Sequence, residues 1–220
     1  MIRAADDRQA YYELLPDYAQ LHHAFEWAIA DDLALAFDLA ANSANLQAGF
    51  NLVRDGHTWA VHLVAAARRT DDDQMIGAAF GTRGNALARM ATLPDEPDKP
   101  GQSRRARLFE ALAAYDEALE HRRPEVAPLD YAMALGNDAI SLCQIAAISG
   151  EDRRGRLAEA LRCAYTAIAV FVRMEHGPYR RQAVDLLQWI RAGAGELFVE
   201  LWAELDVGEP PEWLADGGAD

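Results

Sequence analysis

The sequence has little cysteine and no long run of apolar residues. Its two cysteines, Cys143 and Cys163, have no CxxC spacing and no histidine cluster beside them, so we expect buried free thiols rather than a zinc site or a disulfide framework. No stretch approaches the roughly 18 uncharged apolar residues of a membrane span, and the N-terminus lacks a signal peptide's basic and apolar regions. We therefore expect a soluble, cytoplasmic protein that does not associate with membranes.

The sequence also lacks the motifs of familiar enzymes. Its single lysine, Lys99, precedes Pro100, so no Gly-x-x-x-x-Gly-Lys-Ser/Thr phosphate loop is present. There is no Gly-x-Ser-x-Gly nucleophile elbow, and neither cysteine has a histidine close in sequence. His22, His23 and Glu26 lie one helical turn apart, but the paired Glu-x-x-His pattern of di-iron bundles is missing. We expect no catalytic residues, no metal and no cofactor.

Basic charge is scarce relative to acidic charge. With 21 Lys and Arg against 35 Asp and Glu, the net charge is −14, which repels a nucleic-acid backbone. The densest basic groups, at residues 104–107 and 153–156, are expected to be solvated helix ends. Residues 206–220 read as an acidic tail, and residues 1–16 as an N-terminal extension. Nucleic acid is therefore not an expected partner.

Residues that favour helices dominate the sequence. No proline occurs between Asp17 and Leu93, and β-branched residues never form an alternating run, so the pattern predicts an all-α fold without a sheet. In the second predicted helix Leu35, Leu39, Leu46 and Phe50 mark an apolar stripe, after which Gly56 is expected to form a turn. Four helices are predicted in this part, at about 17–30, 33–53, 58–69 and 72–91.

Three glycines, at positions 77, 81 and 84, lie on one face of the fourth predicted helix, which favours close approach of a neighbouring helix. A proline-rich segment at 94–102 then interrupts the pattern as a linker or loop. It separates two helix hairpins at 17–93 from two more at 103–205. The second half has predicted helices at about 104–120, 128–149, 156–173 and 179–205, which makes about eight helices in all.

The second half of the chain repeats itself. Arg107-Leu-Phe-Glu-Ala-Leu112 recurs as Arg156-Leu-Ala-Glu-Ala-Leu161, 49 residues later, and Pro128 recurs as Pro178. Gly84-Asn85 is matched by Gly136-Asn137. A repeated helix–turn–helix unit of this kind predicts a solenoid, in which each unit buries its apolar face against the next.

Two segments resemble known families. Residues 128–140, with Leu135-Gly136, followed by the helix carrying Ala160, Ala164 and Ala167, resemble an elongated tetratricopeptide repeat. Leu21-His-His-Ala-Phe-Glu-Trp-Ala28, followed by Leu33-Ala-Leu-Ala-Phe-Asp-Leu-Ala-Ala41, resembles the start of the C-terminal helical sensor region of bacterial STAND-type signalling ATPases. These resemblances imply a right-handed array of antiparallel helix hairpins, a TPR-like α-solenoid, and a place in a bacterial signalling or regulatory system.

The favoured function is a non-catalytic module that binds a protein or peptide. By analogy with the tetratricopeptide groove, the candidate binding residues are Arg83, Asn85, Tyr131, Asn137 and Asp138. The tryptophans at positions 27, 59, 189 and 202 lie on apolar helix faces and are expected in the core. Two alternatives remain open: a scaffold that associates with copies of itself as a homo-oligomer, and a helical bundle that binds a small molecule or acts as an enzyme.

The purified chain is expected not to hydrolyse ATP. Without the glycine and lysine geometry of a phosphate loop, it cannot stabilise the charge of a transferring phosphoryl group. Release of inorganic phosphate measures this directly. Turnover that persisted through repeated purification would contradict the assignment as a non-catalytic module.

Overall fold

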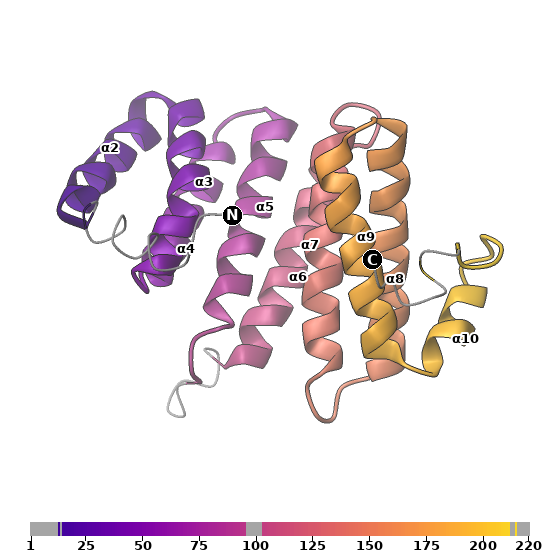
Figure 1. Cartoon of the computed structure of the whole chain (residues 1–220). Coiled ribbons are helices and arrows are strands. Elements are labelled where there is room, and N and C mark those ends of the chain that lie inside the picture. The colour runs from indigo at the N-terminus through magenta and orange to yellow at the C-terminus, as the bar shows by residue number, and fades with distance from the viewer. Residues whose placement is uncertain (1–12, 14, 96–102, 212–213, 215–220) are drawn as a thin grey trace. The chain divides into compact units, whose positions relative to one another are not determined.

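The computed structural model describes residues 13, 15–95, 103–211 and 214, and within them all regular structure is helical (Figure 1). The prediction of an all-α fold is therefore confirmed for this part of the chain. The molecule consists of two compact units, unit 1 (Met1–Arg107) and unit 2 (Leu108–Asp220). The boundary falls inside a helix. Most of the predicted linker at 94–102 lies outside the described residues.

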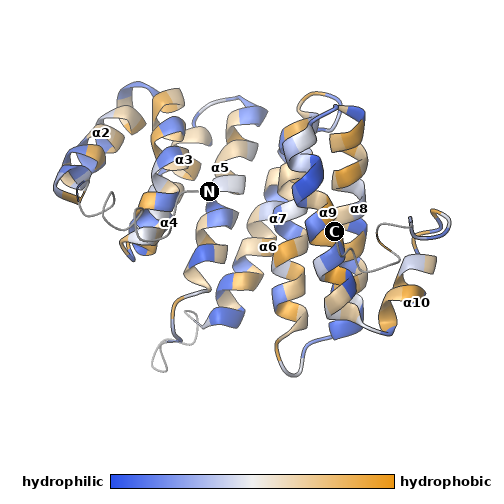
Figure 2. Cartoon of the chain, viewed as in Figure 1, coloured by the Kyte–Doolittle hydropathy of each residue, from blue (hydrophilic) through white to orange (hydrophobic). Residues whose placement is uncertain are grey.

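In its described part, unit 1 contains a short 3-10 helix, η1 (Leu15–Asp17), and four complete α-helices, each of which packs against the next. Two of these helices, α3 and α5, begin at acidic caps: Asp32 accepts a hydrogen bond from the backbone N–H of Leu35 at 3.1 Å, and Asp72 accepts from that of Gln74 at 2.8 Å. Hydrophobic and hydrophilic residues alternate around the helices, as the colouring in Figure 2 shows. The four are α2 (Tyr18–Asp31), α3 (Leu33–Gly49), α4 (Val53–Ala67) and α5 (Asp73–Met90).

The core of unit 1 is built around Trp59, which is 1% exposed. Its ring stacks on Phe25, with centroids 4.2 Å apart and planes within 1°, and Tyr18 lies parallel to it at 6.4 Å. His22 meets the same ring edge-on at 5.8 Å. Helices α2 and α4 are thus held together by one aromatic cluster, which adds directional attraction to the area it buries.

The boundary between α3 and α4 differs from the prediction. The turn lies at residues 50–52, where Asn51 has a positive φ of 60°, and Gly56 lies inside α4. An ideal Cβ at Gly56 would lie 2.5 Å from Oε1 of Gln47, so this glycine allows α3 and α4 to approach closely. The predicted stripe on α3 is also wrong. The buried face is Ala36, Ala40, Ser43 and Gln47, and Leu35 is 37% exposed.

One predicted surface residue is buried. Arg107 is 2% exposed, whereas Arg104 and Arg105 are exposed as expected. Its Nη1 donates to the carbonyl oxygens of Met90, at 2.8 Å, and Leu93, at 3.3 Å. Arg107 therefore binds carbonyl groups at and just beyond the C-terminal end of α5.

Unit 2 contains most of α6 (Arg104–His121), followed by α7 (Pro128–Ala146), α8 (Arg153–Arg173), α9 (Gly177–Ala194) and α10 (Leu197–Ala203). α8 packs against both α7 and α9, and α10 packs on α8 and α9. The last predicted helix, 179–205, is divided in two at Gly195, whose φ of 60° and ψ of −129° end α9. After α10 the chain returns so that Nε1 of Trp202 donates to the carbonyl oxygen of Gly208 at 2.8 Å.

The internal repeat corresponds to regular spacing of these helices. α6 and α8 begin 49 residues apart, and so do α7 and α9. Equivalent positions of α6 and α8 are buried in both copies, including Leu108 with Leu157 and Ala111 with Ala160. The recurring sequence therefore marks recurring core positions, as a structural repeat requires.

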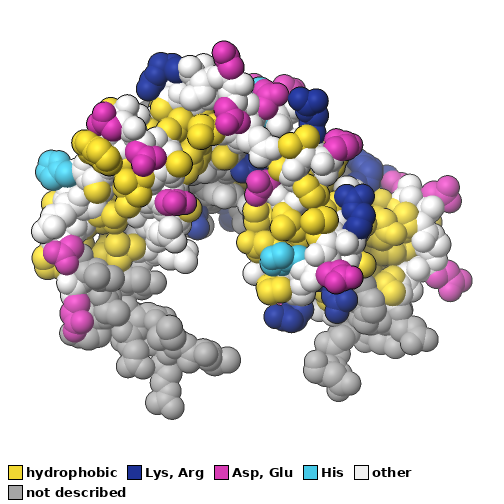
Figure 3. Space-filling model, turned by 90° about the horizontal axis from the view of Figure 1, so that it is seen from above, with side chains coloured by type: hydrophobic (Ala, Val, Ile, Leu, Met, Phe, Trp, Pro, Cys, Tyr) yellow, Lys and Arg dark blue, Asp and Glu magenta, His cyan; other side chains and the backbone are white. Residues whose placement is uncertain are grey.

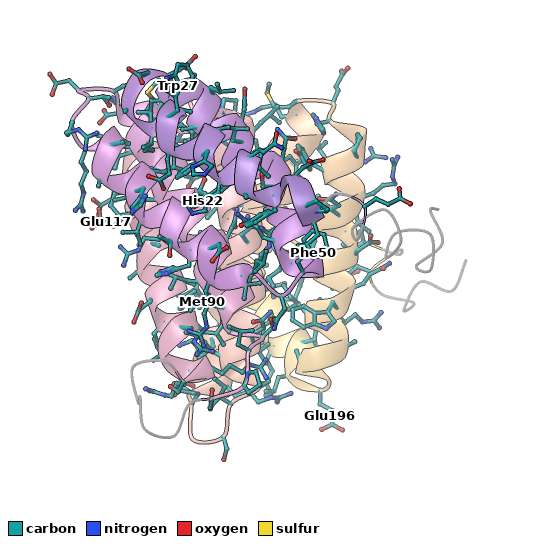
Figure 4. All side chains as sticks on the ribbon, turned by 90° about the vertical axis from the view of Figure 1, so that its left-hand side faces the viewer. His22, Trp27, Phe50, Met90, Glu117 and Glu196 are labelled. Atoms are coloured by element: carbon teal, nitrogen blue, oxygen red, sulfur yellow. The ribbon has the colours of Figure 1, made fainter. Side chains whose placement is uncertain are left out.

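Two of the four tryptophans expected in the core are at the surface. Trp59 and Trp202 are buried, but Trp27 is 57% exposed and Trp189 is 49% exposed. Trp27 lies on α2, the helix that also carries His22 (Figure 4). Within residues 13, 15–95, 103–211 and 214, no helix is both long and apolar enough to cross a lipid bilayer.

Trp59→Ala is expected to lower the free energy of unfolding by about 3–5 kcal/mol, because it leaves a cavity where three aromatic rings met. Trp27→Ala, on the exposed side of α2, should change it by less than about 1 kcal/mol. Urea denaturation of both full-length variants, followed by circular dichroism, checks the difference. Equal losses for the two variants would show that the aromatic cluster does not hold unit 1 together.

Candidate binding groove between helices α7 and α9

Two cavities follow each other between α7 and α9 in unit 2. The first has a volume of about 180 Å³ and the second of about 140 Å³. We call the two together the α7–α9 groove. The first is lined by Ala132, Met133, Gly136, Asn137, Ile140, Phe171, Tyr179, Gln182, Ala183 and Leu186. The second is lined by Cys143, Ala146, Ala147, Arg153, Leu157, Trp189, Ile190 and Gly193.

The lining shows how the two helices run. The first cavity joins the N-terminal halves of α7 and α9, and the second joins their C-terminal halves. The two helices therefore run parallel, with the antiparallel α8 packed against both. From Ala132 to Ala147 the groove follows α7 for about 22 Å at the helical rise per residue. This is the length of several residues of an extended or helical peptide.

The groove is open because a glycine forms part of its floor and large side chains stand beside it. An ideal Cβ at Gly136 would have no atom within 4 Å, so the space above this glycine is empty. Beside it Ile140 is 38% exposed, and farther along Trp189 is 49% exposed. Figure 3 shows hydrophobic side chains at the molecular surface among charged ones. An exposed tryptophan ring beside a cavity is typical of a binding surface, where it supplies a large contact area.

The chemistry of the groove is apolar with a few uncharged polar groups. Asn137, Gln182 and Tyr179 supply amide and hydroxyl groups, and among the described residues no Asp or Glu lines either cavity. Arg153 stands at the far end, where its Nη2 donates to the carbonyl oxygen of Gly193. A wider cavity of about 710 Å³ lies on the α8–α9 side, but Arg180, Arg181 and Asp185 make its wall charged. The α7–α9 groove is the better site for apolar side chains.

Only one predicted residue lines this groove. Asn137 faces the first cavity, whereas Tyr131 is half-buried and lines neither cavity. Asp138 is 6% exposed, so it cannot face a partner as predicted. Arg83 and Asn85 lie on α5 in unit 1, and Asn85 lines a separate cavity there. The five predicted residues therefore do not form a single site within either unit.

Asp138 has an unusual environment for a carboxyl group. Its Oδ2 accepts a hydrogen bond from the thiol of Cys163 at 3.6 Å, while its Oδ1 is buried without a hydrogen-bond partner among the described residues. Burial, and next the charge of Asp116 on α6, raise the pKa of Asp138 to about 7. Glu159 raises it further, and the Cys163 hydrogen bond and Arg156 oppose the rise. The carboxyl group is therefore largely protonated in mildly acidic solution.

Neither thiol is activated. Burial raises the pKa of Cys143 to about 12, and burial together with Asp138 raises that of Cys163. A thiol that stays protonated is a poor nucleophile and a poor metal ligand. In the part of the chain that the structure describes, no cluster of three or more His, Cys, Asp or Glu could hold a metal ion.

Most residues that line the groove carry no signal in the sequence. Met133, Ile140 and Leu186 were indistinguishable from core residues, and Trp189 was assigned to the core. One signal was present: Gly136 weakens the middle of a helix, a cost that an open binding surface explains.

Comparison with known proteins adds no relative. No protein-family model matches the sequence, and no curated protein matches it significantly.

Asp138→Asn is expected to stabilise the protein increasingly as the pH rises. Because the folded-state pKa is raised, the wild-type protein loses stability from the unfolded-state pKa near 4 up to about 7, and asparagine does not titrate. Between about pH 5 and pH 8 the stability of the variant relative to wild type should grow by about 2–3 kcal/mol.

Urea denaturation of both proteins at the two pH values provides the measurement. The difference between them isolates Asp138, since all other titrating groups are common to both chains. If the difference in unfolding free energy between Asp138→Asn and wild type did not change with pH, the pKa of the buried carboxyl group would not be raised.

Proposed function

We propose that the chain is a non-catalytic protein-interaction module, and that the α7–α9 groove holds an apolar segment of a partner protein. The observation that carries the proposal is the line of two cavities beneath Ile140 and Trp189, both of which expose much of their side chains. An apolar side chain of the partner would fill each cavity, and Asn137 and Gln182 would hydrogen-bond its backbone.

The energetics support a peptide of moderate affinity. Burying exposed apolar surface contributes about 25 cal/mol per Å², and tryptophan is among the residues that most often dominate binding. The walls are helices already fixed by the core of unit 2, through Leu187 and Ile190 on α9 and Ala139 on α7. Little ordering is therefore needed on this side of the complex, which lowers the entropic cost of association.

In this proposal the helix hairpins form a right-handed TPR-like α-solenoid. Two observations support it: the 49-residue spacing of helix starts in unit 2, and the parallel course of α7 and α9. In a solenoid of helix pairs the first helix of every pair lines one surface, so parallel neighbours form its groove. The resemblances in sequence extend the proposal to a cytoplasmic sensor or scaffold in a bacterial signalling system, in the manner of STAND-type regulators.

Filling the groove tests the proposal. Gly136→Leu adds a side chain into empty space, so it should block the first cavity without a clash in the folded protein. It should keep or raise stability, since leucine favours a helix over glycine by about 1 kcal/mol. Peptides selected from a displayed random library on the wild-type chain should bind this variant at least about tenfold more weakly, by fluorescence anisotropy.

Two further variants make the test specific. Trp189→Ala should also weaken the selected peptides, because it removes the largest exposed ring of the groove. Ala169→Leu places the same leucine on the exposed side of α8, outside the groove, and should leave binding unchanged. Peptides that bind all three variants equally would exclude the groove. Enrichment of no peptide, together with a concentration-dependent mass in light scattering, would favour self-association.

A further inference from the structure

The two cavities of the α7–α9 groove repeat along both walls at an interval of seven residues. On α9, three positions of the first lining return in the second: Gln182 as Trp189, Ala183 as Ile190 and Leu186 as Gly193. On α7, the positions of Gly136 and Ile140 return as Cys143 and Ala147, and only Ala146 has no such counterpart. The second cavity is therefore the first one displaced by one heptad.

A helical glycine opens each cavity. Gly136 on α7 lines the first and Gly193 on α9 lines the second, and an ideal Cβ at either position would have no atom within 4 Å. Neither glycine has a positive φ, so the backbone does not require this residue type. A glycine inside a helix costs about 1 kcal/mol relative to alanine. Since nothing within unit 2 fills the two spaces, they suit side chains that enter from outside.

The seven-residue interval distinguishes a helical ligand from an extended one. Because both walls are α-helices, equivalent points of the two cavities lie about 10 Å apart at the helical rise per residue. In an α-helix, residues seven positions apart share one face and have this same spacing. In an extended segment, side chains on one face are spaced by about 7 Å or 13 Å. The repeat of the groove therefore matches a helix.

The polar groups of the groove favour the same form. The side chains in the second cavity that carry nitrogen or sulfur are Cys143, Arg153 and Trp189, and none of them is a good hydrogen-bond acceptor. The backbone N–H groups of an extended segment that faced this cavity would find no acceptor side chain there. A helix satisfies its own backbone N–H groups except at its first turn, so it needs no such acceptor.

We propose that the α7–α9 groove binds an amphipathic helix of the partner protein, whose apolar anchor residues lie seven positions apart and fill one cavity each. This inference rests on the proposed function and names the form of the partner. The cavities, of about 180 and 140 Å³, suit an anchor the size of leucine or phenylalanine, since a cavity of ~150 Å³ holds a benzene ring. Asn137 and Gln182 would meet one end of the helix, where backbone groups lack partners within the helix.

Two displayed libraries of peptides of about 21 residues, selected on the full-length chain, test the form of the ligand. One library allows apolar residues only at the first and fourth positions of each heptad, and the other places the same residues in strict alternation. The tightest heptad peptide should bind at least about tenfold more strongly than the tightest alternating peptide, by fluorescence anisotropy. When it is ¹³C-labelled and bound, its Cα chemical shifts should be those of a helix.

The register is tested with variants that fill one cavity each. Gly136→Leu and Gly193→Leu should each weaken the tightest heptad peptide at least about tenfold. Alanine at the anchor that enters the filled cavity should remove that effect, because the added leucine then has nothing to displace. The two anchors identified in this way should lie seven positions apart. Ala192→Leu, on the exposed side of α9 and outside the groove, is the matched control and should change affinity by less than about twofold.

Two results would overturn the helical ligand and leave peptide binding in the groove intact: anchors four positions apart, or the Cα chemical shifts of an extended chain. Peptides that bind equally to the wild-type chain and to both filled variants would remove the groove itself, and the proposed function with it. A concentration-dependent mass in light scattering that Gly193→Leu abolishes would assign the groove to a second copy of the chain, against a separate partner. If Gly193→Leu does not fold, judged by circular dichroism, the two libraries and the chemical shifts decide.

Discussion

Close packing of alanine faces is the constraint on which both units depend. Ala28, Ala36, Ala60 and Ala67 in unit 1 are completely buried, and unit 2 buries Ala111, Ala132, Ala160 and Ala167 in the same way. Where small side chains pack between two helices, the distance between the helix axes lies toward the shorter end of its usual range. Large side chains then fit only at chosen positions, such as that of Trp59. Where the neighbouring helix comes close, a larger residue must turn outward instead.

This constraint explains the surface as well as the core. α3 buries the face with Ala36 and Ala40, and Leu35 is left partly in solvent. On α9 the buried positions are Ala183, Leu187 and Ile190, which leaves Trp189 beside the groove. The apolar residues that do not fit between the helices are therefore available for binding. In such a fold the same packing that gives stability also creates the exposed apolar surface.

Close packing leaves some buried polar atoms without hydrogen-bond partners. Asp138 keeps one oxygen without a partner, and Trp59 keeps its indole N–H without one, among the residues described. The two respond differently. A carboxyl group can take up a proton, and its raised pKa shows that it does so near neutrality. An indole N–H has no such option, because it can only donate.

The sequence by itself determined the helical class, most helix boundaries and the 49-residue repeat, because helix propensity, caps and prolines act locally. It could not determine which face of each helix is buried. The stripe of Leu35, Leu39, Leu46 and Phe50 was the more hydrophobic face of α3, yet the tertiary structure buries the smaller one. Gly56 was read as a turn, but it serves a contact with Gln47 from another helix. Asn137, named by analogy with a repeat, lines a cavity in the structure, whereas Trp189 was assigned to the core because its exposure depends on α7. Helix formation depends on neighbours in sequence, and burial depends on neighbours in space, which only the tertiary structure supplies.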